Sequence, residues 1–356
     1  MKLSSQTHNI PLYGFLKKVP KAELHLHLEG AIPIGTLYRL AQANNETSIK
    51  SLGDLKKRLT YSDFVSFVRA WTWMNSLIQR EEDFEDIAYS VLRNLSEQEV
   101  SYAEVFFSPG DYQKQKLSPD GVTENVIKGK ERAERQFGTR CQLIVDLVRN
   151  YGPAYGYELV KDLEDYLGRG VIGIGLGGSE AKYPADAYTA VYAQAKKRGY
   201  RLTAHAGEVA GASSIWAVVK KLRVERVGHG LRAYEDQRLV SYLRKSQIPL
   251  EMCVTSNVMT RVCGSLVSHP IGKYFRRGLM VTANSDDPTF FDTTITNEYL
   301  TLVRSFHFTP NELRRLILNA VQSSFASEAD KLRMGLAFEK RFDRLGLTGE
   351  VWTDRS

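Results

Sequence analysis

The chain has 356 residues, of which 43% are hydrophobic and 25% are charged, a composition typical of a globular protein. This composition excludes a disordered chain, a collagen and a coiled coil. The formal charge is +7, from 48 Lys and Arg against 41 Asp and Glu. The basic residues are scattered in pairs such as Lys17-Lys18 and Arg276-Arg277, which indicates a solvated mixed surface and predicts no nucleic-acid partner.

Cysteine content and hydrophobic segments indicate in which cellular compartment the protein is expected. The three cysteines, Cys141, Cys253 and Cys263, have no C-x-x-C spacing and argue against a disulfide framework. The first 15 residues contain no continuous apolar segment and so make a poor signal peptide. The chain contains no stretch of 18 apolar residues, so no membrane span is predicted. We therefore expect a cytoplasmic protein without a membrane partner.

Eight short segments are rich in apolar and β-branched residues. They are apolar on both faces, as expected for buried parallel strands. In chain order they are Ala22–Leu28, Ser101–Phe107, Cys141–Val148, Val171–Leu176, Arg201–His205, Arg226–His229, Pro249–Val254 and Leu279–Ala283.

Helix-like sequence fills the gaps between these segments. From the second segment onward, the segments begin 23 to 40 residues apart. The sequence between them is helical in pattern, as at 187–197, 214–222 and 236–243. Eight strand–helix units predict an α/β protein, a (β/α)8 TIM barrel, and Asn297–Leu345 is expected to close its outer ring of helices. The competing fold is a doubly wound open sheet, but no G-x-G-x-x-G follows the first strand.

The first gap is the longest and runs from about residue 31 to 99. It contains helix-like segments at Thr36–Gln42 and Glu82–Leu95 and an aromatic stretch at Tyr61–Trp73. An insertion after the first barrel strand lies at the catalytic mouth, so it is either a helical cap over the active site or a set of extra core helices. We predict a single barrel domain over residues 1–356.

Histidines are concentrated at the ends of the predicted strands. Four of the seven lie at carboxyl ends of strands, where barrel active sites are built: His25, His27, His205 and His229. Alternate residues of a strand face the same side, so His25 and His27 can converge on one point. The eighth strand ends in a pair of aspartates, Asp286 and Asp287.

This residue set predicts a metal site. Imidazole nitrogens and carboxylate oxygens suit zinc, and three histidines with one aspartate leave a position for water, as in a catalytic site. The alternative is a set of histidines that are hydrogen-bonded inside the barrel without a metal.

Five motifs in order resemble those of the adenosine deaminase family of the amidohydrolase superfamily. They are PKAELHLHLEGAI, HAGE, RVGHG, SNVMT and NSDDP, and they run from about residue 20 to 300 with compatible spacings. The resemblance implies hydrolytic removal of the 6-amino group of a purine, with one Zn²⁺ per chain. The other zinc-deaminase architecture requires P-C-x-x-C, which this sequence lacks.

The resemblance also assigns roles to individual residues. It implies that zinc is bound by His25, His27, His205 and Asp286. It implies a catalytic role for Glu208 as the proton donor to purine N1, for His229 in positioning the attacking water and for Asp286 in accepting a proton from it. The substrate-binding residues would be Asp287 at N7, Gly178 with its backbone N–H at N3, and Glu29 near the ribose.

The chemistry of these residues is coherent without the family. Zinc lowers the pKa of water to about 7, and protonation of the ring makes C6 more electrophilic. Glu208 lies three residues after His205, around the turn at the end of the strand, so both can face one pocket. A closed pocket would raise the pKa of Glu208 so that it donates at neutral pH. Taken singly, Glu208 could be a surface carboxylate, and Gly178 part of a tight turn.

The motifs also depart from those of adenosine deaminases. The chain has Glu29 where these enzymes usually have aspartate, and Gly175 and Ser179 replace acidic residues that are common in their fourth strand segment. We expect adenosine as the substrate, with adenine, aminodeoxyfutalosine or a modified adenosine as alternatives. Trp71 and Trp73, with Phe64 and Phe67 at helical spacing, either pack in the core or cover a purine.

Two rival functions remain. A catalytically silent barrel could bind a nucleoside as a sensor, but it would not need the proton donor Glu208. A two-metal amidohydrolase would be favoured by a bridging carboxylated lysine, and neither the fourth nor the fifth predicted strand ends in a lysine.

Overall fold

Eight parallel strands form one sheet in sequential order in this computed structural model, which describes residues 10–61 and 64–352. The strands are β1 (Lys21–His27), β2 (Val100–Phe107), β3 (Arg140–Val148), β4 (Val171–Gly177), β5 (Arg201–Ala206), β6 (Arg226–His229), β7 (Leu250–Met252) and β8 (Val281–Ala283). A bridge between Leu26 and Asp286 brings the segment after β8 against β1. The predicted TIM barrel is therefore confirmed, and each strand ends within two residues of its predicted bounds.

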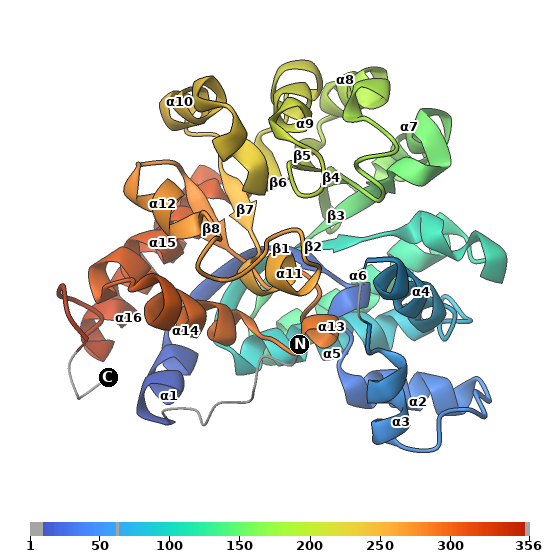
Figure 1. Cartoon of the computed structure of the whole chain (residues 1–356). Helices are drawn as coiled ribbons and strands as arrows, with labels where there is room; N and C mark the ends of the chain where they lie inside the picture. The colour runs from blue at the N-terminus through green and yellow to red at the C-terminus, as the bar shows by residue number, and fades with distance from the viewer. Residues whose placement is uncertain (1–9, 62–63, 353–356) are drawn as a thin grey trace.

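Helices surround the barrel (Figure 1). They are α1 (Ile10–Lys18), α2 (Ile34–Ala43), α3 (Leu52–Arg58), α4 (Phe64–Asn75), α5 (Asp83–Glu97), α6 (Pro119–Phe137), α7 (Gly152–Asp162), α8 (Thr189–Arg198), α9 (Ala212–Ala217), α10 (Gln237–Ser246), α11 (Val254–Met259), α12 (Ile271–Arg276), α13 (Pro288–Phe291), α14 (Ile295–Phe306), α15 (Pro310–Ser323) and α16 (Glu328–Leu345). The C-terminal helices α14 to α16 correspond to the predicted helical segment 297–345. The predicted helix at 214–222 is α9 followed by a short π-helical segment, Val218–Leu222.

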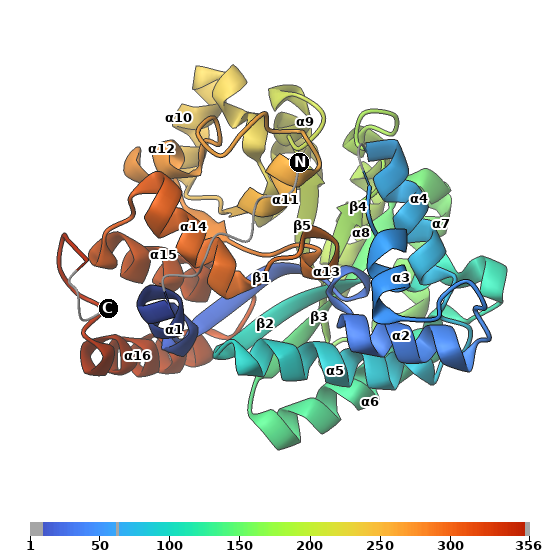
Figure 2. The same cartoon turned by 60° about the horizontal axis from the view of Figure 1, so that its bottom comes forward.

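The insertion between β1 and β2 contains α2 to α5. Figure 2 shows α5 running beside α6 below β2 and β3, so α5 belongs to the outer layer of helices. The helix α4 contains most of the predicted aromatic stretch Tyr61–Trp73, of which residues 62–63 lie outside the described part of the chain. The ring of Trp71 on α4 is perpendicular to that of His27 at the end of β1, and the two ring centroids are 6.4 Å apart. The insertion thus contacts the strand ends through α4.

Buried charges accompany the apolar core inside the barrel. Glu104 of β2, Arg226 of β6 and Glu251 of β7 are all at most 1% exposed. Arg226 forms ion pairs of 2.5 Å with both glutamates, which satisfies charges that would otherwise be costly to bury. These side chains connect opposite strands of the barrel directly beneath the strand ends.

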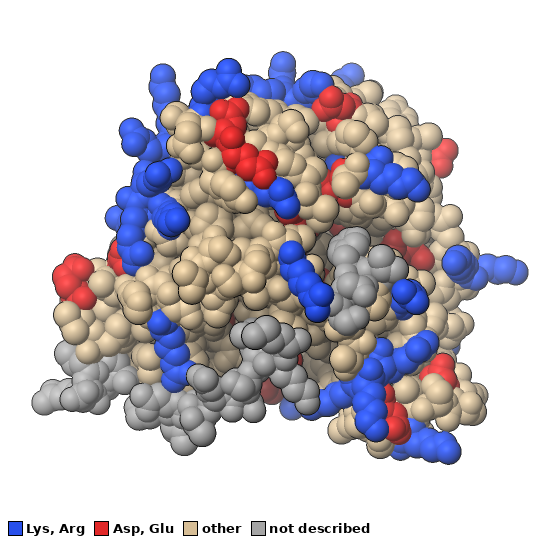
Figure 3. Space-filling view, viewed as in Figure 1, with Lys and Arg blue, Asp and Glu red and all other residues tan. Residues whose placement is uncertain are grey.

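One face of the surface is shown in Figure 3. Its Lys and Arg side chains lie mostly along the rim, many of them near α10 and α12, and few lie near the centre. Within residues 10–61 and 64–352, no helix is both long and apolar enough to span a membrane.

Candidate active site

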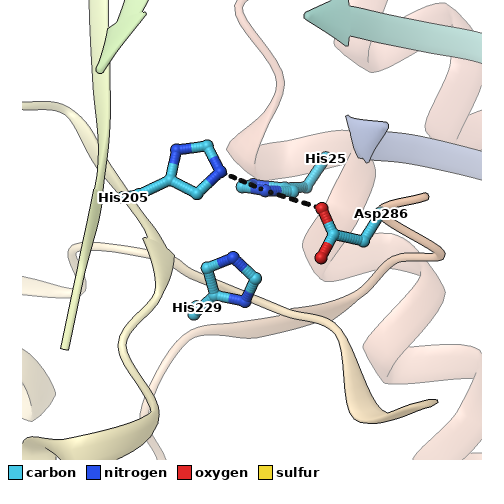
Figure 4. Close-up of side chains that lie close together, drawn as sticks. All are labelled: His25, His205, His229 and Asp286. Carbon is cyan, nitrogen blue, oxygen red and sulfur yellow. Dashed lines mark hydrogen bonds and ion pairs between the residues drawn. The ribbon is translucent and has the colours of Figure 1, made fainter. Parts of the chain in front are cut away.

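Four side chains converge at the carboxyl ends of β1, β5, β6 and β8. Their ligand atoms all lie within 4.8 Å of one another, and Figure 4 shows the side chains of His25, His205, His229 and Asp286 turned toward a common centre. His27 joins this group, because its Nε2 atom lies 3.1 Å from Nε2 of His205 and 3.4 Å from Oδ1 of Asp286. All five residues were predicted from the sequence, and the structure brings them together.

The distances among four of these atoms match the edges of a coordination tetrahedron. Nε2 of His25 lies 3.1 Å from Nε2 of His205 and 3.5 Å from Oδ1 of Asp286. Ligands that are roughly 2.0–2.1 Å from a tetrahedral zinc ion lie about 3.3 Å from one another. Imidazole nitrogens that face one another this closely inside a protein are favourable when a cation lies between them. The residues present therefore fit a metal ion.

The protonation of the histidines also suits a metal. Burial lowers the pKa of His27 to about 3 and that of His229 to about 4, and it lowers the pKa of His205 well below its usual value. These imidazoles are neutral at physiological pH, which is the form that binds metals.

A chain of hydrogen bonds orients His25 from behind. Its Nδ1 atom lies 2.8 Å from Oε2 of Glu251, and Nε of Arg226 donates to Oε1 of the same carboxylate at 2.5 Å. Because a carboxylate only accepts, Nδ1 of His25 donates to Glu251, and Nε2 is the ring nitrogen that faces the centre. Arg226 in turn contacts Glu104, which accepts a 2.7 Å hydrogen bond from Tyr102. Carboxylates that support histidine ligands in this way raise metal affinity.

Two of the site residues have a left-handed backbone. The φ angle of His229 is +59° and that of Asp286 is +64°. Such conformations cost a non-glycine residue about 1–3 kcal/mol and are concentrated at functional sites. His229 is the last residue of β6, and Asp286 lies three residues after the end of β8, so both are at strand ends where their side chains face the centre.

Glu208 lies beside this cluster on the loop after β5. Its Oε2 atom is 3.7 Å from Nε2 of His229. Burial, together with the negative charges of Asp286 and Glu180, raises the pKa of Glu208 to about 8. The carboxyl group is therefore mostly protonated at neutral pH and can donate a proton.

Glu180 holds the loop that carries Glu208. It accepts backbone N–H groups of Gly207 at 2.6 Å, Val209 at 2.8 Å and Ala210 at 2.9 Å. The anchored amides lie on both sides of Glu208 in the chain, so Glu180 fixes the position of Glu208. Glu180 was not among the site residues predicted from the sequence.

The three predicted substrate-binding residues lie at the same end of the barrel. Glu29 follows β1 and accepts the N–H of Ser108 at 2.9 Å with Oε1, while its Oε2 has no hydrogen-bond partner. Burial raises its pKa to about 7. Oδ1 of Asp287 is also buried without a partner. Gly178 directly follows β4 and has a φ angle of +86°, a conformation that favours glycine.

The sequence analysis missed a further carboxyl group, that of Asp146. This β3 residue pairs with Gly175 of β4, is 4% exposed, and its Oδ1 has no hydrogen-bond partner. A Cβ atom on Gly175 would lie 2.8 Å from Oδ1, and one on Gly177 would lie 2.4 Å from Oδ2. The two glycines therefore make room for a carboxyl group supplied by β3, at the point where adenosine deaminases commonly have an acid on the fourth strand.

Aromatic side chains of α4 lie against those of α13. The rings of Trp71 and Phe290 stack with centroids 5.5 Å apart, and those of Phe67 and Phe291 with centroids 5.8 Å apart. Trp71 also lies close to Asp111, which follows β2. Trp71 thus packs in an aromatic cluster, as one of the two predictions has it, and it also lies beside His27.

Comparison with known proteins identifies the family. A model of the family described as adenosine deaminase matches residues 20–337. The chain belongs to the adenosine deaminase family. An adenine deaminase of Wolinella succinogenes is 33% identical over 322 residues, covering 90% of this chain and 97% of the relative. An aminodeoxyfutalosine deaminase of Streptomyces avermitilis is 32% identical, covering 91% of each chain.

A solved structure agrees with this assignment. The adenine deaminase of Arthrobacter aurescens is 30% identical and superposes with a TM-score of 0.87 over 91% of this chain and 99% of its own. Members of the family are metal-dependent hydrolases, and this chain is a hydrolase that deaminates a purine. The predictions of the family and of the reaction class are confirmed.

Proposed function

We propose that the protein catalyses the zinc-dependent hydrolytic deamination of adenosine to inosine and ammonia. The observation that carries the proposal is the arrangement of His25, His27, His205 and Asp286, whose ligand atoms are 3.1–3.5 Å apart beside a protonated Glu208. Three imidazoles and one carboxylate are ligands that zinc prefers, and one zinc ion held by these four residues would accept a water as a fifth ligand.

The metal and the side chains have separate tasks in this reaction. When bound, zinc supplies a nucleophile at neutral pH by lowering the pKa of water to about 7. Glu208 donates its proton to N1 of the purine, which makes C6 more electrophilic. Asp286 accepts a proton from the attacking water, and His229 holds the oxygen of that water by a hydrogen bond. Ammonia leaves once the amino group of the tetrahedral intermediate has been protonated.

The substrate-binding groups support a purine that carries an uncharged sugar. We assign Asp287 to N7 of the ring, the N–H of Gly178 to N3, and Glu29 to the ribose. Glu29 and Asp146 each present a carboxyl oxygen without a partner, and such groups suit hydroxyl donors. Burial, followed by the negative charges of Asp111 and Glu29, raises the pKa of Asp146 well above its usual value. A phosphate is bound best by Arg, Lys or backbone N–H donors, and the proposed sugar position presents carboxyl groups instead, so adenosine is favoured over AMP.

The helix α4 supplies a further wall in this proposal. Trp71 lies beside His27, stacks on Phe290 and lies close to Asp111. We assign it to the side of the pocket that excludes water from the purine, with the rest of the insertion forming outer helices.

The test is ammonia release by the purified, zinc-loaded protein from a panel of substrates. The panel contains adenosine, 2′-deoxyadenosine, adenine, N6-methyladenosine, aminodeoxyfutalosine and AMP, with an EDTA-treated control. We expect metal-dependent release that is fastest with adenosine and absent with AMP. Fastest release from adenine would move the assignment to the free base, and no release from any compound would favour the silent sensor.

A further inference from the structure

His229 is the one member of the clustered histidines whose ring is held by an amide. Its Nδ1 atom lies 3.1 Å from Nδ2 of Asn257, which belongs to α11 directly after β7. Asn257 is fully buried, and its backbone N–H and C=O are hydrogen-bonded to Cys253 and Cys263. The side-chain amide is therefore a fixed partner of the imidazole.

A second histidine, from outside the predicted site, determines how this amide is oriented. Nε2 of His269 lies 3.2 Å from Oδ1 of Asn257. On the other side of the ring, the backbone N–H of Ile271 donates to Nδ1 of His269 at 3.3 Å. His269 is 3% exposed, and burial lowers its pKa to about 3, so the ring is neutral.

The direction of each hydrogen bond follows from the backbone donor. Because Nδ1 of neutral His269 accepts from Ile271, the proton of the ring is on Nε2, which donates to the carbonyl oxygen of Asn257. The amide NH₂ of Asn257 then faces Nδ1 of His229 and donates to it. Nδ1 of neutral His229 is an acceptor, and its proton is on Nε2.

We propose that Asn257 and His269 are positioning residues that fix His229 as the Nε2–H tautomer, so that His229 is a hydrogen-bond donor to the attacking water and not a metal ligand. A ring nitrogen that carries a proton has no lone pair for a metal. The inference rests on the proposed function, and it separates His229 from His25, His27 and His205, which we assign as metal ligands. Nε2 of His229 lies 3.7 Å from Oε2 of Glu208, on the side where the purine is assigned.

The decisive variant is Asn257→Asp, which keeps the size of the side chain and removes its donor. A carboxylate accepts on both oxygens, so it still binds the N–H of His269 but requires the proton of His229 to move to Nδ1. The tautomer is read by long-range ¹H–¹⁵N NMR of the full-length, zinc-loaded protein with labelled histidine, and the His229 signal is assigned by its loss in His229→Ala. We expect the Nε2–H form in the wild type and the Nδ1–H form in Asn257→Asp.

Activity should change with the tautomer. Loss of the correct tautomer of a catalytic histidine removes a factor of about 10²–10⁴ in kcat, and we expect a fall in this range with KM little changed. The matched control is Ser256→Ala, in the same helix, whose buried hydroxyl has no hydrogen-bond partner. It should retain both the tautomer and the activity. A wild-type His229 with its proton on Nδ1 would overturn the proposal.

Metal content tests the same inference without an activity measurement and without the Asn257→Asp variant. His229→Ala should retain about one zinc per chain by elemental analysis, whereas His27→Ala should lose it. Zinc loss in His229→Ala together with zinc retention in His27→Ala would identify His229 as a ligand and refute the tautomer assignment. Deamination without the expected tautomer would refute this inference alone, while the expected tautomer without deamination of any purine would refute only the proposed function.

Discussion

The site has a reaction side, formed by the clustered histidines with Asp286 and Glu208, and a substrate side, formed by the predicted substrate-binding residues and Asp146. The two sides differ in how the hydrogen bonds of their polar groups are satisfied. On the reaction side, His25 is held by Glu251 and His229 by Asn257, and each partner is itself hydrogen-bonded to a further buried residue. On the substrate side, Glu29 and Asp146 each have a buried carboxyl oxygen without a partner. A buried polar atom without a partner is costly, and at the mouth of the barrel a ligand can supply the missing hydrogen bond. The comparison indicates that His25 and His229 are fixed before substrate arrives, whereas the substrate side is completed by it.

The largest expected effect tests the proton donor on the reaction side. Glu208→Gln should lower kcat by about 10²–10⁴-fold and retain zinc, because the amide keeps the shape of the side chain but has no acidic proton. In the wild type, kcat/KM should fall as the pH rises through about 8, where the raised pKa of Glu208 leaves the carboxyl group deprotonated. A pH profile of steady-state kinetics measures both.

Glu208→Asp is the control for this experiment. It retains an acidic group with a shorter reach, so it should be slow but should keep the alkaline fall that Glu208→Gln loses. Near-normal turnover of Glu208→Gln would exclude the proton-donor role.

A smaller effect is expected from the support behind His25. Glu251 accepts with both oxygens, from His25 on one side and Arg226 on the other, and an amide has one accepting oxygen only. Glu251→Gln should therefore weaken zinc affinity by about 10–100-fold, measured by competition with a chelator. Glu104→Gln, at the far end of the same network, is the control and should have a weaker effect. Equal losses in both variants would mean that the network acts on folding and not on His25.

The sequence predicted the fold and the reaction side better than it predicted the substrate side. Apolar segments at regular spacing sufficed for the strands, and histidines at strand ends identified the cluster. Asp146 was missed because its importance depends on the pairing of β3 with β4, which places it over Gly175. His269 was missed because it lies before α12 and reaches the site only through Asn257. Charged residues inside otherwise apolar strands, such as Glu251, were the available signal for the network beneath the site.

The substrate side can be tested at Asp146. Asp146→Asn should lower kcat/KM for adenosine by about 10-fold, the equivalent of about 1.4 kcal/mol for one hydrogen bond to a carboxyl group. Adenine lacks the sugar and is the internal control, so its turnover should change less if Asp146 faces the ribose. An equal loss for both compounds would assign Asp146 to the purine ring or to the stability of the barrel.

The smallest effect is expected at Glu29, where the change keeps the carboxyl group and moves it by one methylene. Oε1 of Glu29 is held by the N–H of Ser108, so Glu29→Asp must either give up this bond or withdraw the free oxygen from the pocket. In both cases the contact with a substituent on N9 weakens or lengthens, and we expect a shift of about 2–5-fold in the ratio of kcat/KM for adenosine to that for adenine, or less than 1 kcal/mol. The ratio, measured with both compounds in competition, is insensitive to the fraction of active enzyme. If the ratio is unchanged in Glu29→Asp but changed in Asp146→Asn, sugar recognition is assigned to Asp146 on β3. Glu29 then serves only to hold the loop after β2.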